Sequence, residues 1–266
     1  MVQVTGHVFS HMVIIKTDKE IAILREGGKR LAWILDMVAK KIAPGITTNE
    51  LDSYARQLIV EGGDAAAFLG YTPDGANYPY PAALCTSVND EVVHGIPKNR
   101  KLKKGDIVSI DLGLKHTGMF TDHARTIAVG KPTKQLQKLL STTEEALMVG
   151  IQAARGGNTV GDIGAAILAY VKPHGYGIVR ELAGHGVGRA IHEDPYVPNF
   201  GKAGKGERLV PGMVIAIEPM LNLGSKEVVF EDDGYTVKTR DGKQSAHFEH
   251  TILITDCEPE ILTCLN

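Results

Sequence analysis

The chain has 266 residues, 43% hydrophobic and 23% charged, a composition typical of a globular protein with a substantial core. Its net charge of −2, with no basic stripe and no acidic tail, argues against nucleic acid or a membrane surface as the main partner. Three cysteines without a CxxC spacing argue against a disulfide framework, and no apolar run is long enough for a transmembrane helix. We therefore expect a cytoplasmic protein.

The chain begins with a segment that we set apart from the folded domain. Residues 1–12 lack the basic region and the apolar run of a signal peptide, so they are interpreted as an N-terminal extension or a cloning remnant. Apolar patterning and glycine stops then predict a strand at 12–15, a helix at 18–45 and a second helix at 47–63. Thr48 or Asn49 is expected to cap the second helix, because either side chain can accept a hydrogen bond from the first turn.

The second half of the chain repeats these helices. Residues 144–171 again show an apolar helix, a glycine stop and a second amphipathic helix. The start of that second helix recurs at a constant offset of 112 residues, with Thr47, Glu50 and Leu51 matched by Thr159, Asp162 and Ile163.

The strands repeat as well. LKKGDIVSID (102–111) aligns without gaps on LVPGMVIAIE (209–218), 107 residues later, and each segment leads from a glycine turn through an apolar strand to a carboxylate at its end. A repeat of about 110 residues is too long for a solenoid unit. We therefore expect an α+β fold in one domain, residues 13–266, whose related halves (about 18–130 and 131–266) close on a shared sheet.

Four carboxylates are expected at strand positions. Asp111 and Glu218 follow continuous apolar runs typical of buried strands, and a buried carboxylate must be paired, hydrogen-bonded or metal-bound. A hairpin reversing around His116–Thr117 would place Asp111 directly opposite Asp122, with Cβ atoms roughly 5 Å apart. The second half offers Glu218 and Glu249 in matching positions. Because four such acids would repel one another, the pattern favours a binuclear divalent metal site, with a metal-free dyad of the aspartic type as the alternative.

Two histidines lie seven residues apart in GHGVGRAIHEDP (184–195). The glycines argue against a helix, and an odd spacing would send the two side chains to opposite faces of a strand. His185 and His192 are therefore expected on a loop, where functional side chains are often found. A ligand set of carboxylates with one imidazole favours Mn, Fe(II), Co or Zn over a thiolate zinc site.

Five segments together resemble, in order and in spacing, the motif set of the type I methionine aminopeptidases: VVHGIP (92–97), IDLGLKHTGMFTD (110–122), GHGVGRAIHEDP (184–195), IEPM (217–220) and SAHFEHTILIT (245–255). The similarity runs from about residue 17 to the C-terminus. It implies the duplicated pita-bread fold, with halves related by a pseudo-twofold axis around a central curved sheet, in agreement with the repeat. It also implies a metalloaminopeptidase that removes the initiator methionine from nascent polypeptides.

The resemblance implies two divalent metal ions, of Mn, Fe, Co or Zn, held by five side chains. Carried over by position, these are Asp111, Asp122, His185, Glu218 and Glu249. Asp122 and Glu249 would bridge the ions, Asp111 would complete the shell of one ion, and His185 with Glu218 would complete the other.

The resemblance also implies three catalytic residues. His192 would hydrogen-bond the scissile carbonyl and steady the tetrahedral intermediate, and His94 would contact the substrate amine or the scissile nitrogen. Glu218 could take the proton of the attacking water and return it. No ligand role is implied for five other histidines, of which the matched pair His123 and His250 is expected to lie behind the ligands or to be structural: His116, His123, His174, His247 and His250.

A methionine side chain requires an apolar, adaptable slot. The resemblance implies that its walls are formed by Phe68, Tyr71, Tyr80, Cys85, Ile191 and Tyr235. The loop TPDGANYP (72–79) is longer than in the usual bacterial form, so a purely structural role in the core remains open for Phe68 and Tyr71. Ile191 stands where an aromatic residue is common, and His247 stands where glutamine is common. These departures bear on side-chain preference and leave the ligands intact.

Other functions on the same scaffold make different predictions. Only 25 residues separate His192 from Glu218, which leaves no room for the helical insertion of the type II relatives. A proline-directed aminopeptidase would usually carry an extra N-terminal domain, for which the residues before the first helix are too few. A non-catalytic binding module would be expected to lack a ligand, whereas all five are present. The expected substrate is the N-terminal Met of nascent peptides, the expected state is a monomer, and a transient ribosome contact is compatible with both.

Overall fold

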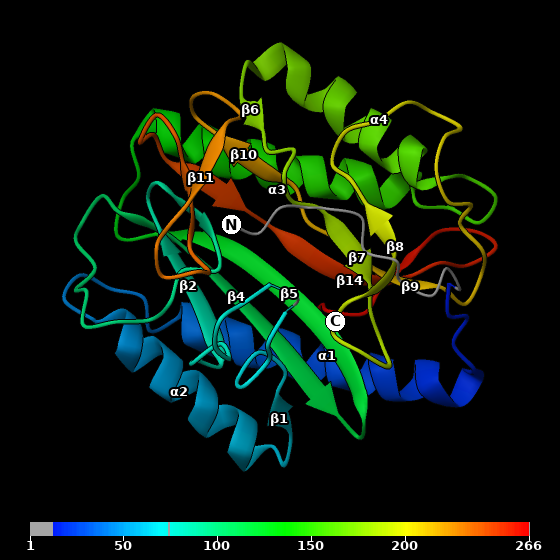
Figure 1. Cartoon of the computed structure of the whole chain (residues 1–266), viewed down its shortest axis with the longest axis horizontal. Helices are drawn as coiled ribbons and strands as arrows, with labels where there is room; N and C mark the ends of the chain where they lie inside the picture. Colours follow the sequence, from blue (N-terminus) through cyan, green and yellow to red (C-terminus); the bar gives the residue numbers. More distant parts are fainter. Residues whose placement is uncertain (1–12, 74, 266) are drawn as a thin grey trace.

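The computed structural model of the chain describes residues 13–73 and 75–265, which form a curved sheet flanked by two pairs of helices (Figure 1). The prediction of a strand at 12–15 is wrong for residues 13–15, which have no regular structure. Met12 lies outside the described residues. The backbone N–H of Lys16 donates to the Gly212 carbonyl at 2.9 Å. The segment therefore lies along the turn at Gly212 without entering a strand ladder.

Each half of the chain contributes one helix pair. The helices are α1 (Asp18–Ala39), α2 (Thr48–Glu61), α3 (Lys134–Ala153) and α4 (Val160–Val171), with a short 3-10 helix, η1 (Lys172–His174), after α4. The first helix stops at Ala39, well before the expected glycine stop at Gly45, and Lys40 is its C-cap. Pro44 explains the early end, because proline cannot donate a helical hydrogen bond and disfavours the helical conformation of the residue before it.

The N-cap of α2 is Thr47, so the expectation of Thr48 or Asn49 is wrong. The Thr47 hydroxyl accepts the N–H of Glu50 at 3.2 Å, and the Glu50 carboxylate accepts the N–H of Thr47 at 2.7 Å. This reciprocal pair is a capping box, whose signature is threonine followed three residues later by glutamate. The Thr48 hydroxyl donates instead to the Lys98 carbonyl at 2.8 Å.

All described strand pairs are antiparallel, and the main sheet has nine strands. Its path runs β1 (Ala65–Ala66), β4 (Ile107–His116), β5 (Met119–Ala128), β14 (Glu249–Leu253), β9 (Val214–Ile217), β7 (Gly184–Gly186) and β8 (Glu193–Val197), with β2 (Leu84–Val88) on β4 and β15 (Glu260–Ile261) on β14. One small sheet joins β13 (Ser245–His247), β10 (Met220–Asn222) and β6 (Gly177–Ile178), and the other joins β11 (Val228–Phe230), β12 (Val237–Thr239) and β3 (Glu91–Val93).

The repeat seen in the sequence has a counterpart in the backbone pairing. An isolated bridge joins Thr47 to Lys101 in the first half, and the equivalent bridge joins Thr159 to Arg208 in the second. Between the halves, β5 pairs with β14 so that His123 lies opposite His250, the residues at matched places in the repeat. The two imidazoles stack with ring centroids 4.6 Å apart. The local twofold axis therefore passes between these two histidines.

The register of the β4–β5 hairpin differs from the expected one. Its turn residues are Thr117 and Gly118, with φ of 47° and 86°, because His116 pairs with Met119. Asp111 therefore lies opposite Ala124, and Asp122 lies opposite Gly113. The two aspartates still share a face, as diagonal neighbours rather than directly opposed residues. Asp111 is also in the middle of β4, not at the end of a strand, whereas Glu218 does follow the last residue of β9.

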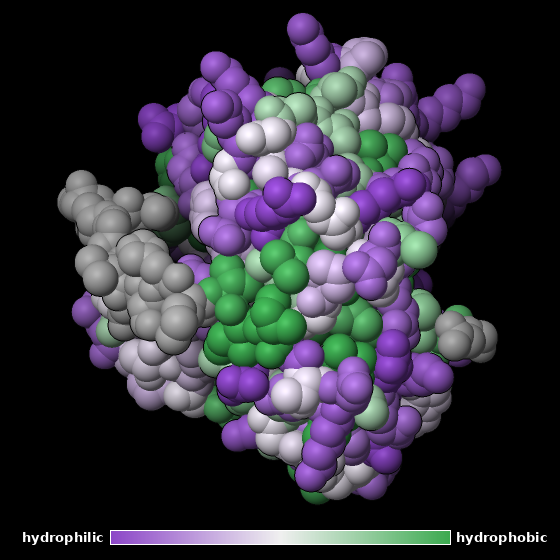
Figure 2. Space-filling model, turned by 90° about the vertical axis from the view of Figure 1, so that its right-hand side faces the viewer, coloured by the Kyte–Doolittle hydropathy of each residue, from purple (hydrophilic) through white to green (hydrophobic). Residues whose placement is uncertain are grey.

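The two helix pairs cover one side of the sheet, and the apolar core lies between the helices and the sheet. In Figure 1, α1 and α2 lie beneath β4 and β5, and α3 and α4 lie along the strands of the second half. Each pair packs on its own apolar cluster, one centred on β4 and one on β9 and β14. The face at the right of Figure 1 is largely hydrophilic, with apolar area gathered near its centre (Figure 2). Within the described residues, no helix is both long and apolar enough to cross a membrane.

Candidate active site

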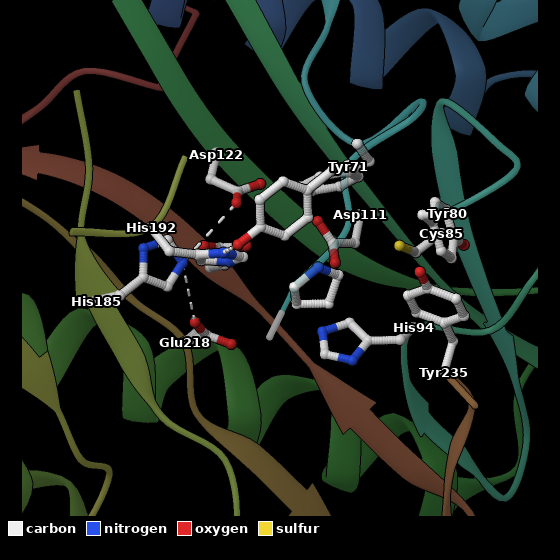
Figure 3. A pocket seen from close by; sticks show the side chains of 13 residues that line it. Tyr71, Tyr80, Cys85, His94, Asp111, Asp122, His185, His192, Glu218 and Tyr235 are labelled. Carbon is white, nitrogen blue, oxygen red and sulfur yellow. Dashed lines mark hydrogen bonds and ion pairs between the residues drawn. The ribbon is translucent and has the colours of Figure 1, made fainter. Parts of the chain in front are cut away.

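Segments from both halves bring the four carboxylates and His185 to one place. Figure 3 labels His185 and three of the acids, Asp111, Asp122 and Glu218. Oxygen atoms of Asp111, Asp122 and Glu249 all lie within 4.8 Å of one another, and so do ligand atoms of His185, Glu218 and Glu249. The Nε2 atom of His185 is 3.6 Å from Glu218 Oε1 and 3.9 Å from Asp122 Oδ2. The geometry thus gathers the five side chains that the sequence analysis named as ligands.

The carboxylates of this cluster cannot all be ionised without a cation. Burial, followed by repulsion from neighbouring acids, raises the pKa values of Asp122 and Glu249 well above their ordinary range, and burial raises the pKa of Asp111 to about 7. Asp111 Oδ1 and Glu249 Oε1 are buried and accept no hydrogen bond from any part of the chain that the structure describes. Orphaned carboxylate oxygens of this kind fit divalent cations, which would supply the missing partners.

His185 is presented by a short strand, not by the loop that we expected. It is the central residue of β7, whose two flanking glycines allow the neighbouring strands to approach closely: a Cβ at Gly184 would lie 2.2 Å from the Ala216 carbonyl oxygen, and one at Gly186 would lie 2.1 Å from the Asp194 carbonyl oxygen. The Nδ1–H of His185 donates to the Gly186 carbonyl at 2.9 Å. This bond leaves the Nε2 lone pair free to face the carboxylates.

His192 lies in the turn between β7 and β8, as expected for a loop residue. Its ring meets that of His185 edge to face, with centroids 4.4 Å apart, and its Nδ1 is 2.8 Å from the Tyr71 hydroxyl. The imidazole is exposed to the cavity, yet the surrounding walls and the nearby histidines lower its pKa well below the ordinary value. The neutral form is therefore favoured.

His94 follows β3 and has a left-handed backbone, with φ of 58°. Its side chain is also exposed to the cavity, and desolvation by the walls lowers its pKa to about 4. In Figure 3 its imidazole is drawn beside Tyr235 and below Asp111. His94 and His192 thus line the same cavity as the carboxylate cluster, and the neutral form of each imidazole is favoured.

A cavity of about 120 Å³ opens beside the cluster. Its apolar walls include five of the six expected residues together with Pro73, which the sequence analysis missed: Phe68, Tyr71, Tyr80, Cys85, Tyr235 and Pro73. Ile191 is buried in the same apolar cluster but does not line the cavity. Its Cδ1 atom lies near Phe68 over Gly113, where a Cβ would be 2.8 Å from the Phe68 ring and 3.1 Å from Ile191 Cδ1. Ile191 therefore supports the wall from behind.

A buried residue near the cluster, His247, was given no ligand role by the sequence analysis. Its Nε2 atom is 3.4 Å from Glu218 Oε2, and neither ring nitrogen has a hydrogen-bond partner within the described residues. The backbone of His247 is held to Thr126, whose hydroxyl accepts the His247 N–H and donates to the His247 carbonyl, both at 2.8 Å. The only sequence signal for this contact was the departure from glutamine.

Comparison with known proteins agrees with this geometry. The chain is 47% identical to a methionine aminopeptidase of Clostridium perfringens over 254 residues, which cover 96% of this chain and 100% of that protein. The crystal structure of a methionine aminopeptidase from Thermotoga maritima matches with a TM-score of 0.91 and 41% identity, covering 96% of this chain and 100% of that one. A prolidase from Pyrococcus furiosus matches less well, with a TM-score of 0.71 and 25% identity, and the chain covers 66% of its length.

The expected pita-bread fold is confirmed, since these relatives share it over nearly the whole of this chain. The model of metallopeptidase family M24 matches residues 22–256. The cluster of carboxylates and imidazole is the kind of ligand set that such an enzyme requires. The chain therefore belongs to metallopeptidase family M24.

Proposed function

We propose that this chain is a methionine aminopeptidase, which hydrolyses the first peptide bond of nascent polypeptides and releases their N-terminal methionine. The observation that carries the proposal is the meeting of an apolar cavity with a buried carboxylate cluster. A cavity of about 120 Å³ suits one apolar side chain, and the carboxylate cluster lines the same cavity, which supports hydrolysis of the adjoining peptide bond there. Relatives named methionine aminopeptidase align with nearly the whole chain, which supports the same activity here.

We further propose that two divalent ions, of Mn, Fe, Co or Zn, are held by Asp111, Asp122, His185, Glu218 and Glu249. Asp122, Glu249 and His185 each belong to two of the groups of converging ligand atoms. Of these three, the two carboxylates have a second oxygen, which supports a bridging role for Asp122 and Glu249. Asp111 would complete the shell of one ion, and His185 with Glu218 would complete the other. Such ions supply Lewis acidity and lower the pKa of a bound water.

The remaining steps belong to side chains of the chain itself. Glu218 is the proposed proton carrier, which accepts a proton from the attacking water and returns it to the leaving amine. If the Tyr71 hydroxyl donates to His192 Nδ1, the proton of this neutral imidazole is on Nε2, where it can be donated to the developing oxyanion. His94, also neutral, would bond the substrate amine or the scissile nitrogen. Phe68, Tyr71, Tyr80, Cys85 and Tyr235 would contact the methionine side chain, with Ile191 behind them.

The same proposal includes a single catalytic domain over residues 13–266, acting as a monomer in the cytoplasm, with a transient ribosome contact where nascent chains emerge. Proline-directed cleavage is the second candidate, since prolidases share the fold. The small apolar cavity favours a methionine side chain over that alternative.

The test is release of methionine from Met-Gly-Met-Met and Met-Pro peptides by metal-stripped protein, with Mn, Co, Fe(II) or Zn added back. We expect metal-dependent release, and a fall of at least about 100-fold in kcat/KM for Asp111→Asn, which removes a ligand oxygen. The exposed Asp256→Asn is the matched control and should leave the rate unchanged. Cleavage of Ala-Pro without methionine release would establish the proline-directed alternative, and no cleavage with any metal would favour a binding module.

A further inference from the structure

A buried ion pair joins the segment before α1 to the turn that carries His192. The Nζ atom of Lys16 donates to Glu193 Oε2 at 2.5 Å, and the two side chains are only 1% and 4% exposed. Lys16 Nζ also donates to the Ile14 carbonyl at 3.2 Å. A buried ion pair is costly to desolvate, so hydrophobic packing alone would serve stability at least as well. The pair calls for an explanation beyond stability.

The carboxylate of Glu193 holds the backbone of its own turn. Its Oε1 atom accepts the N–H of Ala190 at 2.9 Å and also accepts the N–H of Arg189. At the start of the turn, Gly188 has φ of 146°, and a Cβ there would lie only 2.4 Å from Lys16 Cε. The Gly188 carbonyl accepts the N–H of Phe120 at 2.7 Å. The turn is therefore fastened at both ends, with Lys16 packed against it.

Ile191 and His192 lie between these fastenings, and of the two it is His192 that lines the cavity. Ile191 supports Phe68, and His192 immediately precedes Glu193 and lines the cavity. A shift of the Glu193 carboxylate would move the amides of residues 189 and 190 and with them the imidazole of His192. Displacements of about 1 Å at a reacting centre can lower rates about 100-fold.

We propose that Lys16 and Glu193 form a positioning pair that fixes the imidazole of His192 in the orientation required for catalysis. The inference rests on the proposed function for its effect on rate, but the orientation of the ring is a property of the protein alone. Neither residue touches the cavity, and neither belongs to the carboxylate cluster.

The same turn offers an internal comparison. The Arg189 guanidinium donates to Glu20 Oε1 at 2.7 Å, which also links the turn to α1. Both partners of this second ion pair are more exposed, with side chains at 50% and 20%. Exposed ion pairs contribute little, because water competes with them. Arg189→Met should therefore have a small effect, whereas loss of the buried pair should have a large one.

The experiment compares Lys16→Met, Glu193→Gln and the double variant with wild type. Lys16→Met keeps the alkyl stem, and Glu193→Gln keeps an oxygen for the turn amides. We expect each single variant to lower kcat for a Met-Gly-Met-Met peptide by about 10- to 100-fold with little change in KM, and the double variant to be no worse than the poorer single variant. Lys16→Arg, which restores the charge, should recover part of the rate. The matched control is Arg25→Met, which removes the exposed pair of α1 with Glu260.

A second measurement separates positioning from stability and from the proposed function. The ¹⁵N imidazole resonances of His192, assigned with His192→Asn, should shift in Lys16→Met while those of His94 stay in place. If the variants only melt at a lower temperature, with unchanged kcat and unchanged His192 resonances, the pair is structural and the inference is wrong. If wild type releases no methionine but the His192 resonances still shift, the proposed function fails and the positioning of His192 stands. If Glu193→Gln does not fold, Lys16→Met carries both measurements.

Discussion

At the scale of single residues, the bond between Tyr71 and His192 decides how the site can act on a carbonyl. The two atoms are 2.8 Å apart, and the rings lie 5.2 Å apart in a tilted arrangement. The ring of Tyr71 lines the cavity while its hydroxyl reaches the imidazole. One side chain therefore contributes both to the wall of the pocket and to the protonation pattern of His192, the proposed catalytic histidine.

Replacing Tyr71 by Phe separates these two contributions. The ring remains, so KM for a methionyl peptide should change little. Loss of a hydrogen bond worth about 1 kcal/mol should lower kcat roughly 5- to 10-fold. Steady-state kinetics check this, with Tyr170→Phe on α4, away from the cavity, as control. An unchanged kcat with a raised KM would assign Tyr71 to the wall alone.

The sequence could predict some of these site residues better than others. Asp111 and Glu218 could be predicted because each follows a run of apolar residues that is typical of a buried strand. The position of Pro73 in the cavity wall and the contact of His247 with Glu218 could not be predicted from the sequence, because both depend on how loops and strands distant in sequence come together. Ile191 was assigned to the wall by position, but its side chain packs behind Phe68.

At the scale of elements, the same local chemistry builds the two halves. The helices α2 and α4 both start with a capping box, in which Thr47 pairs with Glu50 and Thr159 pairs with Asp162. The threonine backbone N–H groups donate to these acids at 2.7 and 2.8 Å. The repeat in the sequence is thus a repeat of helix starts as well as of apolar pattern.

Thr47→Ala should destabilise the protein by about 1 kcal/mol, because the Thr47 hydroxyl accepts the N–H of Glu50. Thr159→Ala should cost less, because the Thr159 hydroxyl accepts no hydrogen bond from the first turn of α4. Urea unfolding followed by circular dichroism measures the difference. Ser53→Ala, at an exposed position inside α2, is the matched control and should be neutral or slightly stabilising. An equal cost for the two threonines would contradict this difference between the two helix starts.

The hairpin shows why an element can be predicted while its register is not. The apolar run and Gly118 correctly indicated two strands with a tight turn between 111 and 122. The observed two-residue turn requires a positive φ at both Thr117 and Gly118, and threonine seldom adopts that conformation. A turn centred one residue earlier therefore looked equally acceptable. Pairing with β2 and β14, which local sequence does not report, selects the observed register.

At the scale of the whole molecule, the buried acids make metal binding a function of pH. Their raised pKa values mean that the metal-free protein retains protons that the unfolded chain has already released between about pH 4 and pH 7. The stability that the metal-free protein owes to these protonated carboxyl groups is therefore present at low pH, and it is lost as the pH rises through their pKa values in the folded state. Ions must displace the same protons, so their binding strengthens as pH rises.

The melting temperature gained on adding Mn or Co to metal-stripped protein should therefore increase from about pH 5 to about pH 8. Thermal unfolding with and without metal at each pH measures the gain. The buried histidines, such as His250 with a pKa of about 4, oppose folding at acid pH with and without metal, and subtraction removes most of that effect. Asp111→Asn should reduce the gain at every pH. A gain that shrinks with rising pH would contradict raised pKa values in the cluster.

The pairing of His123 with His250 has a consequence for any shortened form of the chain. These residues meet on β5 and β14, where the two halves share one ladder of hydrogen bonds. A fragment of residues 18–130 would keep β5 but lose β14, and its free edge would be a template for another strand. The partner that best restores the lost contacts is a second copy of the same fragment, rotated about the axis that passes between the histidines. A fragment of half the chain should therefore form a dimer, to an extent that depends on its concentration. Fusion of the two halves in one chain makes the same association intramolecular, so that it no longer depends on concentration.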